Sequence, residues 1–328
     1  MTDNGNSVAL IAEFCQNHNG DFDLLARMIE AAAENGATHG KMQTIFADTV
    51  AFRPEFEEGL EVGGTTLAIK RPYQDEYDRL KGLEITFEQS AEFIRRCNDA
   101  GLVPMTTCFA REHAGQLSDL GFQSIKVASY DCASFPMLRD LRAHFDEIIV
   151  STGATYDDEI AHAAEILKGS NFAMLHCVTI YPTPLEAMHL ARMEFLRRHA
   201  PRVGFSDHSL VARDNVTAAK AAITLGAELI ERHFTILGPD ESRDGPVSIN
   251  PEQLSELAAF SKLGPDERKA HMDAEHPDWR ATVGDKERAL SDAELLNRDY
   301  YRGRFASRRP ESRDGRRMVF NWEEVPLS

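Results

Sequence analysis

The sequence predicts an α/β fold, a closed (β/α)8 TIM barrel followed by a C-terminal extension. Short apolar runs that indicate strands alternate with amphipathic segments that indicate helices, and eight such units fit within about 250 residues, the usual size of this barrel. With 328 residues, 42% of them hydrophobic, the chain can bury a core of this size. An open doubly wound sheet is the alternative, but no Gly-x-Gly-x-x-Gly segment follows the first predicted strand, which disfavours it.

The eight predicted strands are short apolar runs that end in polar residues. They span residues 8–14, 39–44, 103–109, 124–129, 148–152, 172–178, 203–205 and 229–230. The predicted helices have apolar residues at helical spacing, as at Leu24, Leu25, Met28, Ile29 and Ala32 in the first of them. These helices span residues 21–35, 87–100, 111–120, 135–141, 157–167, 187–199, 214–225 and 251–263.

Two segments interrupt the alternation. Residues 46–82 contain Pro54, Gly59, Gly63-Gly64 and Pro72 without a sustained period, which predicts a long loop, more often a lid or binding loop than a linker. Residues 265–328 are polar and too short for an independent core. We therefore divide the chain into a catalytic barrel at residues 1–264 and a polar arm at residues 265–328, which packs on the barrel or on a second subunit.

The charge and composition of the chain disfavour several kinds of binding partner and location. A formal charge of −17 disfavours binding to nucleic acid and to anionic membranes, but not to a small anion, because salt screens distant charges within about 10 Å. The five cysteines are scattered without a Cys-x-x-Cys pair, which is typical of reduced thiols in the cytoplasm. No secretory signal or stretch of about 20 apolar residues occurs. We expect a soluble cytoplasmic protein.

Polar residues capable of catalysis follow every predicted strand. The carboxyl ends of the strands of a β/α barrel form one face, which is where active sites of this fold lie. A polar residue at one strand end means little, but polar residues at all eight ends predict a site. They include Glu13, Lys41, Gln43, Thr107, Lys126, Ser129, Asp131, Ser151, Thr179, Tyr181, Ser206, His208, Glu231 and His233.

A pair of histidines stands out among these residues. His208 and His233 follow consecutive strands, and Asp207 and Glu231 lie next to them in the sequence. Two imidazoles with carboxylates beside them can hold one divalent metal and leave coordination positions open. The alternative is that each histidine only caps its strand. The matched pair favours the metal site.

Two lysines occur inside apolar strands. An unpaired ammonium group at Lys41 or Lys126 would be costly to bury. A phosphate or carboxylate ligand would neutralise both, and nearby hydroxyl groups would complete its hydrogen bonds. Internal Lys–Glu pairs and a Schiff-base lysine are the alternatives. Cys15, Cys108 and Cys177 also fall near strand ends, and we interpret them as small core residues.

With these residues identified, the chain resembles the sialic acid synthase family, which includes synthases of N-acetylneuraminic, legionaminic and pseudaminic acids. The resemblance covers residues 8–263 and runs through IAEFCQNHNGD, GKMQT, IKVASYD, VSTGA, LHCVTIYPTP, GFSDHSL, ERHFT and SINPEQL. It implies a β/α barrel that condenses phosphoenolpyruvate with an open-chain N-acylated hexosamine such as N-acetylmannosamine, releasing phosphate. The metal is usually Mn²⁺, with Mg²⁺ or Co²⁺ as other options.

The resemblance also implies roles for the residues at the strand ends. It makes His208 and His233 the metal ligands, and Glu13 and Glu231 the carboxylates near the reacting water and the sugar aldehyde. Thr179 replaces an asparagine that commonly contacts phosphoenolpyruvate, and Asp131 replaces a glutamate that faces the sugar. The other sugar-facing positions are Gln43, Tyr181 and Asp244, and the other phosphoenolpyruvate positions are Lys41, Thr107, Lys126, Ser129, Ser151 and Ser206.

The C-terminal arm departs from the family. Typical members carry an antifreeze-like domain whose Arg-Pro-Gly segment reaches the active site of a partner, and they pair through this extension. The segment YYRGRFAS resembles the start of that domain, but no Arg-Pro-Gly follows it. We therefore expect an incomplete antifreeze-like domain, a homodimer and an unidentified acceptor sugar. The alternatives are a metal-dependent lyase or pyruvate aldolase on the same barrel, and a non-catalytic sugar-phosphate-binding subunit.

Overall fold

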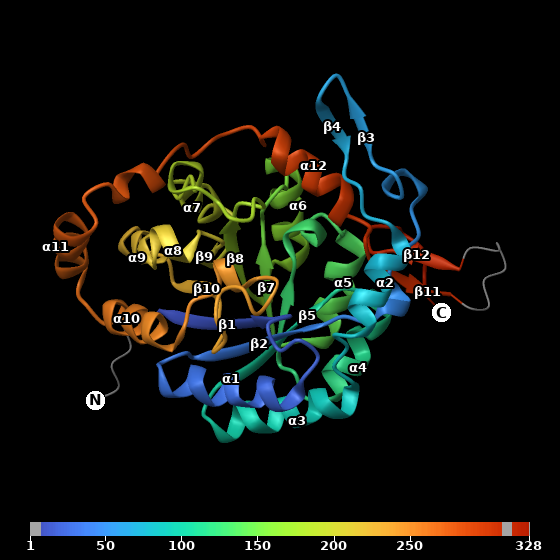
Figure 1. Cartoon of the computed structure of the whole chain (residues 1–328), viewed down its shortest axis with the longest axis horizontal. Helices are drawn as coiled ribbons and strands as arrows, with labels where there is room; N and C mark the ends of the chain where they lie inside the picture. Colours follow the sequence, from blue (N-terminus) through green and yellow to red (C-terminus); the bar gives the residue numbers. More distant parts are fainter. Residues whose placement is uncertain (1–7, 310–316, 328) are drawn as a thin grey trace.

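Eight parallel strands close into a barrel in the order β1-β10-β9-β8-β7-β6-β5-β2. The structure is a computed structural model that describes residues 8–309 and 317–327. Helices surround the barrel on its outside (Figure 1), which confirms the predicted (β/α)8 architecture. The strands of the barrel are β1 Ala9–Cys15, β2 His39–Thr44, β5 Val103–Cys108, β6 Ser124–Val127, β7 Glu147–Ser151, β8 Asn171–Cys177, β9 Arg202–Asp207 and β10 Leu229–His233.

The helices of the barrel follow the predicted segments, with the largest differences in two of them. Residues 187–199 contain only the short helix α7, Arg192–Leu196, and the helix predicted at 214–225 is observed as α9, Thr217–Thr224. His189 and Asn215 each have a φ of 48°, a left-handed conformation that a right-handed helix cannot continue through. The helices are α1 Phe22–Glu34, α3 Phe87–Asp99, α4 Ala114–Asp119, α5 Phe135–His144, α6 Asp157–Leu167, α7 Arg192–Leu196, α8 Val211–Asp214, α9 Thr217–Thr224 and α10 Pro251–Ser261.

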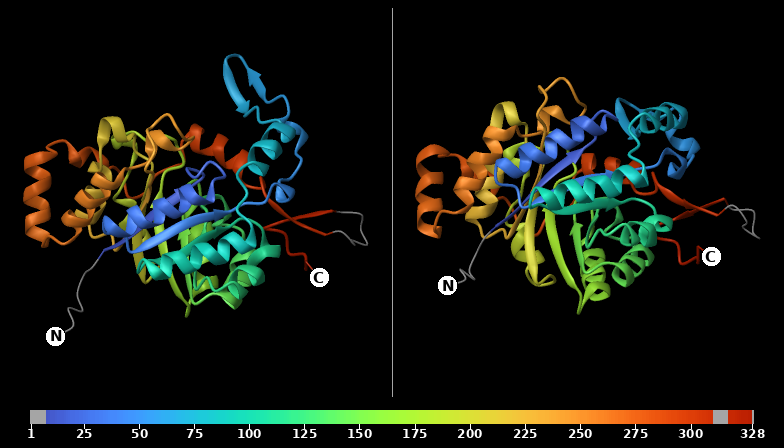
Figure 2. Two further views of the ribbon diagram at one scale, coloured as in Figure 1. Left: turned by 60° about the horizontal axis from the view of Figure 1, so that its bottom comes forward. Right: turned by 90° about the horizontal axis from the view of Figure 1, so that it is seen from below.

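The segment predicted as a long loop has secondary structure of its own. Residues 46–82 contain the hairpin of β3 Leu60–Val62 and β4 Thr65–Ala68, and then the helix α2 Tyr73–Lys81. Gly63 and Gly64 form the turn with φ values of 61° and 83°, and such a two-residue turn fits the twist of a hairpin. The hairpin projects from the barrel (Figure 2). The glycines that suggested a loop therefore mark a hairpin turn.

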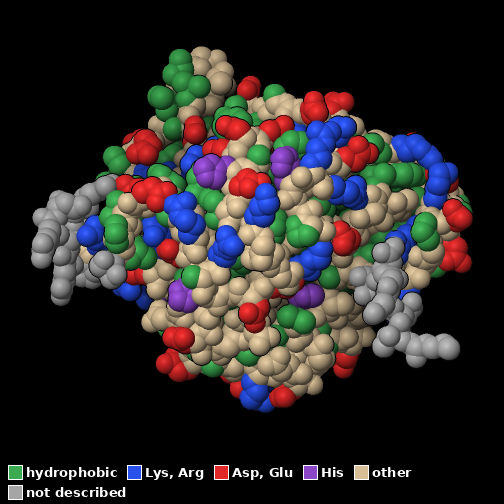
Figure 3. All heavy atoms as spheres, turned by 180° about the vertical axis from the view of Figure 1, so that it is seen from behind, with side chains coloured by type: hydrophobic (Ala, Val, Ile, Leu, Met, Phe, Trp, Pro, Cys, Tyr) green, Lys and Arg blue, Asp and Glu red, His purple; other side chains and the backbone are tan. Residues whose placement is uncertain are grey.

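The hairpin exposes large hydrophobic side chains. Leu60 is 52% exposed, Val62 57% and Leu67 51%. Figure 3 shows hydrophobic side chains gathered on this projection. Single exposed apolar residues are common on protein surfaces, but a group on a projecting element marks a contact surface more often.

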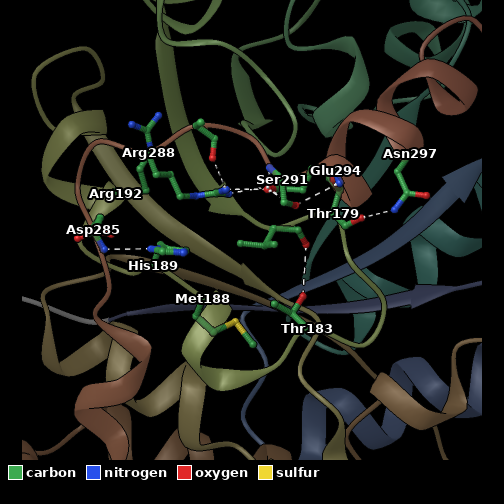
Figure 4. Close-up of polar contacts among 12 residues, drawn as sticks. Thr179, Thr183, Met188, His189, Arg192, Asp285, Arg288, Ser291, Glu294 and Asn297 are labelled. Carbon is green, nitrogen blue, oxygen red and sulfur yellow. Dashed lines mark hydrogen bonds and ion pairs between the residues drawn. The ribbon is translucent and has the colours of Figure 1, made fainter. Parts of the chain in front are cut away.

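The C-terminal arm crosses the barrel end and contacts its loops. It comprises α11 Pro265–Glu275, α12 Asp292–Tyr301 and two antiparallel strands, β11 Ala306–Arg308 and β12 Met318–Phe320. Figure 4 shows how it is attached: Asn297 donates to the carbonyl of Thr179 at 2.7 Å, and the backbone amide of Asp285 donates to His189 at 3.0 Å. The strands β11 and β12 pair with each other and form a small sheet apart from the barrel.

Side chains inside the barrel form an apolar layer below a polar one. The apolar cluster contains Ile11, Met105, Ile149, Ala173, Leu175 and Leu229. Two positions further along four of these strands lie Glu13, Thr107, Ser151 and Glu231. Because side chains on a strand alternate with a period of two, these polar groups also point into the barrel, toward its carboxyl end. None of the helices in the described ranges has the length and apolar character that crossing a bilayer requires.

Candidate active site

A cavity of about 450 Å³ opens at the carboxyl end of the barrel. It is the place where most of the predicted site residues meet, although they come from all parts of the chain. The predicted residues on its wall are Lys41, Gln43, Thr107, Lys126, Ser129, Asp131, Ser151, Tyr181, Ser206, His208, Glu231, His233 and Asp244. A volume of this size is typical of small-molecule sites.

Two predicted residues do not lie on the cavity wall in the described chain. Glu13 is buried, and its carboxylate forms an ion pair with Lys41 and accepts a hydrogen bond from the backbone amide of Cys15 at 2.6 Å. Thr179 is also buried, and its carbonyl accepts from Asn297 of the arm. Both residues therefore contact residues near the cavity without lining it themselves.

The two strand lysines are close to buried carboxylates. Lys41 contacts Glu13, and its Nζ lies 3.8 Å from Glu231 Oε2 and donates to Thr107 at 3.0 Å. Lys126 Nζ lies 3.8 Å from the same oxygen. Internal Lys–Glu pairing was one of the alternatives, and the structure shows carboxylates beside both lysines. The buried carboxylates therefore neutralise the two lysines in addition to any anion that the lysines bind.

Hydroxyl groups surround the lysines in addition to the carboxylates. Lys126 donates to Ser151 Oγ at 2.7 Å and to the carbonyl of Val127 at 3.1 Å. Burial lowers the pKa of Lys41 to about 7, and Lys126 acts in the same direction whereas Glu231 opposes it. A bound anion would favour the charged form of Lys41.

Glu231 has one oxygen without a hydrogen-bond partner. Its Oε1 accepts from Ser206 at 2.9 Å, whereas the buried Oε2 accepts no hydrogen bond among the described residues. Burial by itself raises the pKa of Glu231, but Lys126, Lys41 and the Ser206 hydroxyl together lower it below the ordinary value. Glu231 is therefore ionised at neutral pH, with an oxygen able to accept a proton.

The two histidines lie next to each other, as predicted. The ring centroids of His208 and His233 are 5.3 Å apart, and Tyr181 lies against His208 with a centroid distance of 4.1 Å. Burial lowers the pKa of both histidines, and for His208 the neighbouring His233 and Arg232 add to this effect. Both rings are therefore neutral near pH 7, the form in which imidazole binds metals.

Further donor atoms lie beside His233. A nitrogen of His233, the thiol of Cys15 and a carboxylate oxygen of Asp244 lie within 4.8 Å of one another. His233 Nδ1 is buried and has no hydrogen-bond partner among the described residues. These donors fit a divalent metal ion.

Asp131 is held by the C-terminal arm. Its Oδ1 accepts from Ser134 at 2.8 Å and from Asn321 at 3.0 Å. Burial raises the pKa of Asp131 to about 6, against the lowering effect of these two hydrogen bonds. The arm therefore fixes a carboxylate at the edge of the cavity.

The sequence interpretation missed several residues of the cavity wall. Cys15 was taken as a core residue, yet its thiol lies on the wall. The available signal was its position at the predicted end of the first strand, close to Glu13. Other residues of the wall come from the hairpin segment, the loop after β10 and the arm, which have no barrel periodicity: Arg71, Arg79, Arg243, Asn297, Tyr301, Arg304 and Phe305.

Comparisons with known proteins found a matching family model and several relatives. A model described as the NeuB family matches residues 28–262. The N,N'-diacetyllegionaminic acid synthase of Campylobacter jejuni is 31% identical over 265 residues, which cover 76% of this chain and 73% of that protein. The pseudaminic acid synthase of the same species is 28% identical over 305 residues, 92% of this chain and 82% of that protein.

A solved structure shares the fold. The N-acetylneuraminic acid synthetase of Leptospira borgpetersenii, in complex with citrate, superposes with a TM-score of 0.68 and 24% identity. The superposition covers 92% of this chain and 95% of that chain. The barrel and its surrounding helices are therefore an architecture found in solved structures.

Proposed function

The chain belongs to the NeuB family, and from this premise we propose that it condenses phosphoenolpyruvate with an open-chain aldose to give a 2-keto-3-deoxy sugar acid and phosphate. The enzyme would be a transferase that forms a carbon–carbon bond, and its product a nonulosonate-type acid. The single observation that carries the proposal is the wall of the cavity, where two lysines and their hydroxyl neighbours lie beside an ionised carboxylate and two neutral histidines.

Lys41 and Lys126 are suited to binding the phosphate and carboxylate groups of phosphoenolpyruvate. Both ammonium groups line the cavity, and Thr107 and Ser151 lie within hydrogen-bond distance of them. Charge-assisted hydrogen bonds from such groups are stronger than neutral ones. The same contacts would stabilise the phosphate as it leaves.

Glu231 is suited to proton transfer from the water that must add to carbon 2 of the donor after the new bond forms. Its Oε2 has no hydrogen-bond partner, and the lysines keep it ionised. Gln43, Asp131 and Tyr181 lie elsewhere on the wall and would contact the hydroxyl groups of the sugar. General-base catalysis typically contributes about 10²–10⁴-fold to a rate.

His208 and His233 would hold the divalent metal, with Mn²⁺ as the first choice and Mg²⁺ or Co²⁺ as other options. Such an ion supplies Lewis-acid polarisation of an aldehyde oxygen. The protein contributes by burying both imidazole rings, which keeps them neutral and able to bind the ion. All five cysteines are free and buried in the structure, which supports the proposal of a reducing cytoplasmic location.

The test is release of inorganic phosphate from phosphoenolpyruvate in the presence of metal and a panel of aldoses. We expect release with an N-acylated hexosamine such as N-acetylmannosamine, and no release without an aldose. A keto acid containing all the carbons of both substrates should appear in equal amount by mass spectrometry. No phosphate release with any aldose, under conditions where phosphoenolpyruvate binds, would contradict the proposal.

A pyruvate aldolase with a Schiff base on Lys41 is a second candidate. The observation that favours it is the burial that lowers the pKa of Lys41 to about 7, because a neutral amine is needed to attack a ketone. Borohydride reduction in the presence of pyruvate would then attach the substrate to Lys41. For a synthase we expect no such adduct, and phosphate release instead.

We further propose that the protein is a homodimer and that the hairpin β3–β4 contributes to the contact. A monomer would expose Leu60 and Val62, which lie on one face of β3. Light scattering at micromolar concentration should give twice the mass of the chain, and L60S with V62S should shift it toward the monomer. The control is E61Q, on the opposite face of the same strand. A wild-type monomer with full activity would contradict this proposal.

A further inference from the structure

Three side chains from distant parts of the sequence converge beside the paired histidines. Cys15 ends β1, His233 ends β10, and Asp244 lies in the loop after β10. One donor atom of each lies within 4.8 Å of the other two. Cys15 Sγ is 2.7 Å from Asp244 Oδ2, to which the thiol donates. A thiol, an imidazole and a carboxylate at this spacing are a potential ligand set for one ion.

A second observation points to a ligand at this place. His233 is only 7% exposed, and its Nδ1 has no hydrogen-bond partner among the described residues. A buried polar atom without a partner costs free energy, so such atoms are uncommon unless an ion, a water molecule or a ligand completes them. Its carboxylate neighbour Asp244 and the nearby Glu231 favour a cation over an anion.

The backbone of β1 directs the thiol into this cluster. The register of β1 against β2 shifts between Glu13 and Cys15, and Cys15 has a φ of 51°. Non-glycine residues rarely adopt this conformation. The Cys15 amide donates to the Glu13 carboxylate at 2.6 Å, and Gln43 Nε2 donates to the sulfur at 3.3 Å. The sulfur is thus held between a carboxylate and an amide donor on the cavity wall.

We propose that Cys15 and Asp244 are further ligands of the ion required by the proposed function, so that one thiolate and one carboxylate add to the imidazoles that hold it. His208 lies beside this set, at a centroid distance of 5.3 Å from His233. When the bond between sulfur and metal forms, the thiol proton is released to solvent, and the two negative charges balance the divalent cation.

The ligand chemistry selects among metals. Thiolate and imidazole suit borderline ions such as Zn²⁺ and Co²⁺, whereas Mg²⁺ prefers a shell of oxygen atoms. We therefore expect this site to bind Co²⁺ or Zn²⁺ in preference to Mg²⁺. A pair of histidines alone would not predict this preference.

The test is a cobalt titration of the metal-free protein, without phosphoenolpyruvate or sugar. Wild type should bind one Co²⁺ and show a sulfur-to-cobalt charge-transfer absorption in the near ultraviolet, in addition to the visible bands of the ion. C15S should lose the near-ultraviolet absorption. D244N keeps the thiol and should bind cobalt at least about tenfold more weakly.

C177S is the matched control. Cys177 also lines the cavity, and its Sγ lies 3.7 Å from His208 Nδ1, so this variant removes the other nearby thiol and should keep the absorption. The proposal is overturned if wild type binds cobalt without the absorption or binds none, if C15S keeps it, or if C177S loses it. Since no substrate is present, these results are independent of whether phosphate is released.

Discussion

H233A is expected to lower kcat for phosphate release about a thousandfold. His233 provides a buried, neutral imidazole to the candidate metal centre, and its Nδ1 has no hydrogen-bond partner within residues 8–309 and 317–327. Lewis-acid stabilisation by a metal is worth several kcal/mol, and a loss of about 4 kcal/mol corresponds to this factor. The measurement is kcat with saturating substrates, together with the metal content of the purified variant. H208A should lose activity in the same way.

The control for this prediction is H199A. His199 precedes β9 and therefore lies at the opposite end of the barrel from the cavity. Its replacement should leave both the metal content and kcat within about twofold of wild type, since surface changes usually have small effects. Thermal unfolding should show that all three variants fold. Wild-type kcat in metal-stripped H233A would rule out the assignment.

The barrel could be predicted from the sequence because its strands and helices have strong, regular patterns. The sequence pattern places Lys41 and Glu231 near the ends of predicted strands. The parallel topology of the barrel then brings both residues to the same face. What the sequence could not give is which polar groups satisfy one another. The contacts of Lys41 with Glu13 and of both lysines with Glu231 depend on register and strand tilt, which periodicity does not specify.

The rest of the site comes from segments without a barrel pattern. Arg71 follows the hairpin, and Arg243 lies in the loop after β10. Arg304 lies in the arm and forms an ion pair with Glu76 of α2. Their place on the wall follows from packing between distant segments rather than from local sequence. Cys15 shows a different limit, because the shift of register at the end of β1 decides where its side chain points.

K126M is expected to weaken binding of phosphoenolpyruvate and also to destabilise the protein. A hydrogen bond from a charged group contributes about 1.5–3 kcal/mol, so the affinity should fall roughly ten- to hundredfold. The side chain of Lys126 is only 3% exposed and neutralises Glu231 across 3.8 Å. Removing one partner of a buried ion pair costs about 3–5 kcal/mol, and we expect the lower end because this pair makes no hydrogen bond.

The double variant K126M with E231Q separates these two effects. Replacing Glu231 by a neutral amide removes the negative charge that Lys126 helps to neutralise, so the midpoint of denaturant unfolding should return toward that of wild type. Affinity for phosphoenolpyruvate, measured by calorimetry, should stay low because the ammonium group is still missing. E231Q alone should bind phosphoenolpyruvate at least as tightly as wild type, since a negative charge near an anion has been removed. If the double variant recovers both stability and affinity, Lys126 serves only to neutralise Glu231, and its role in binding the substrate is wrong.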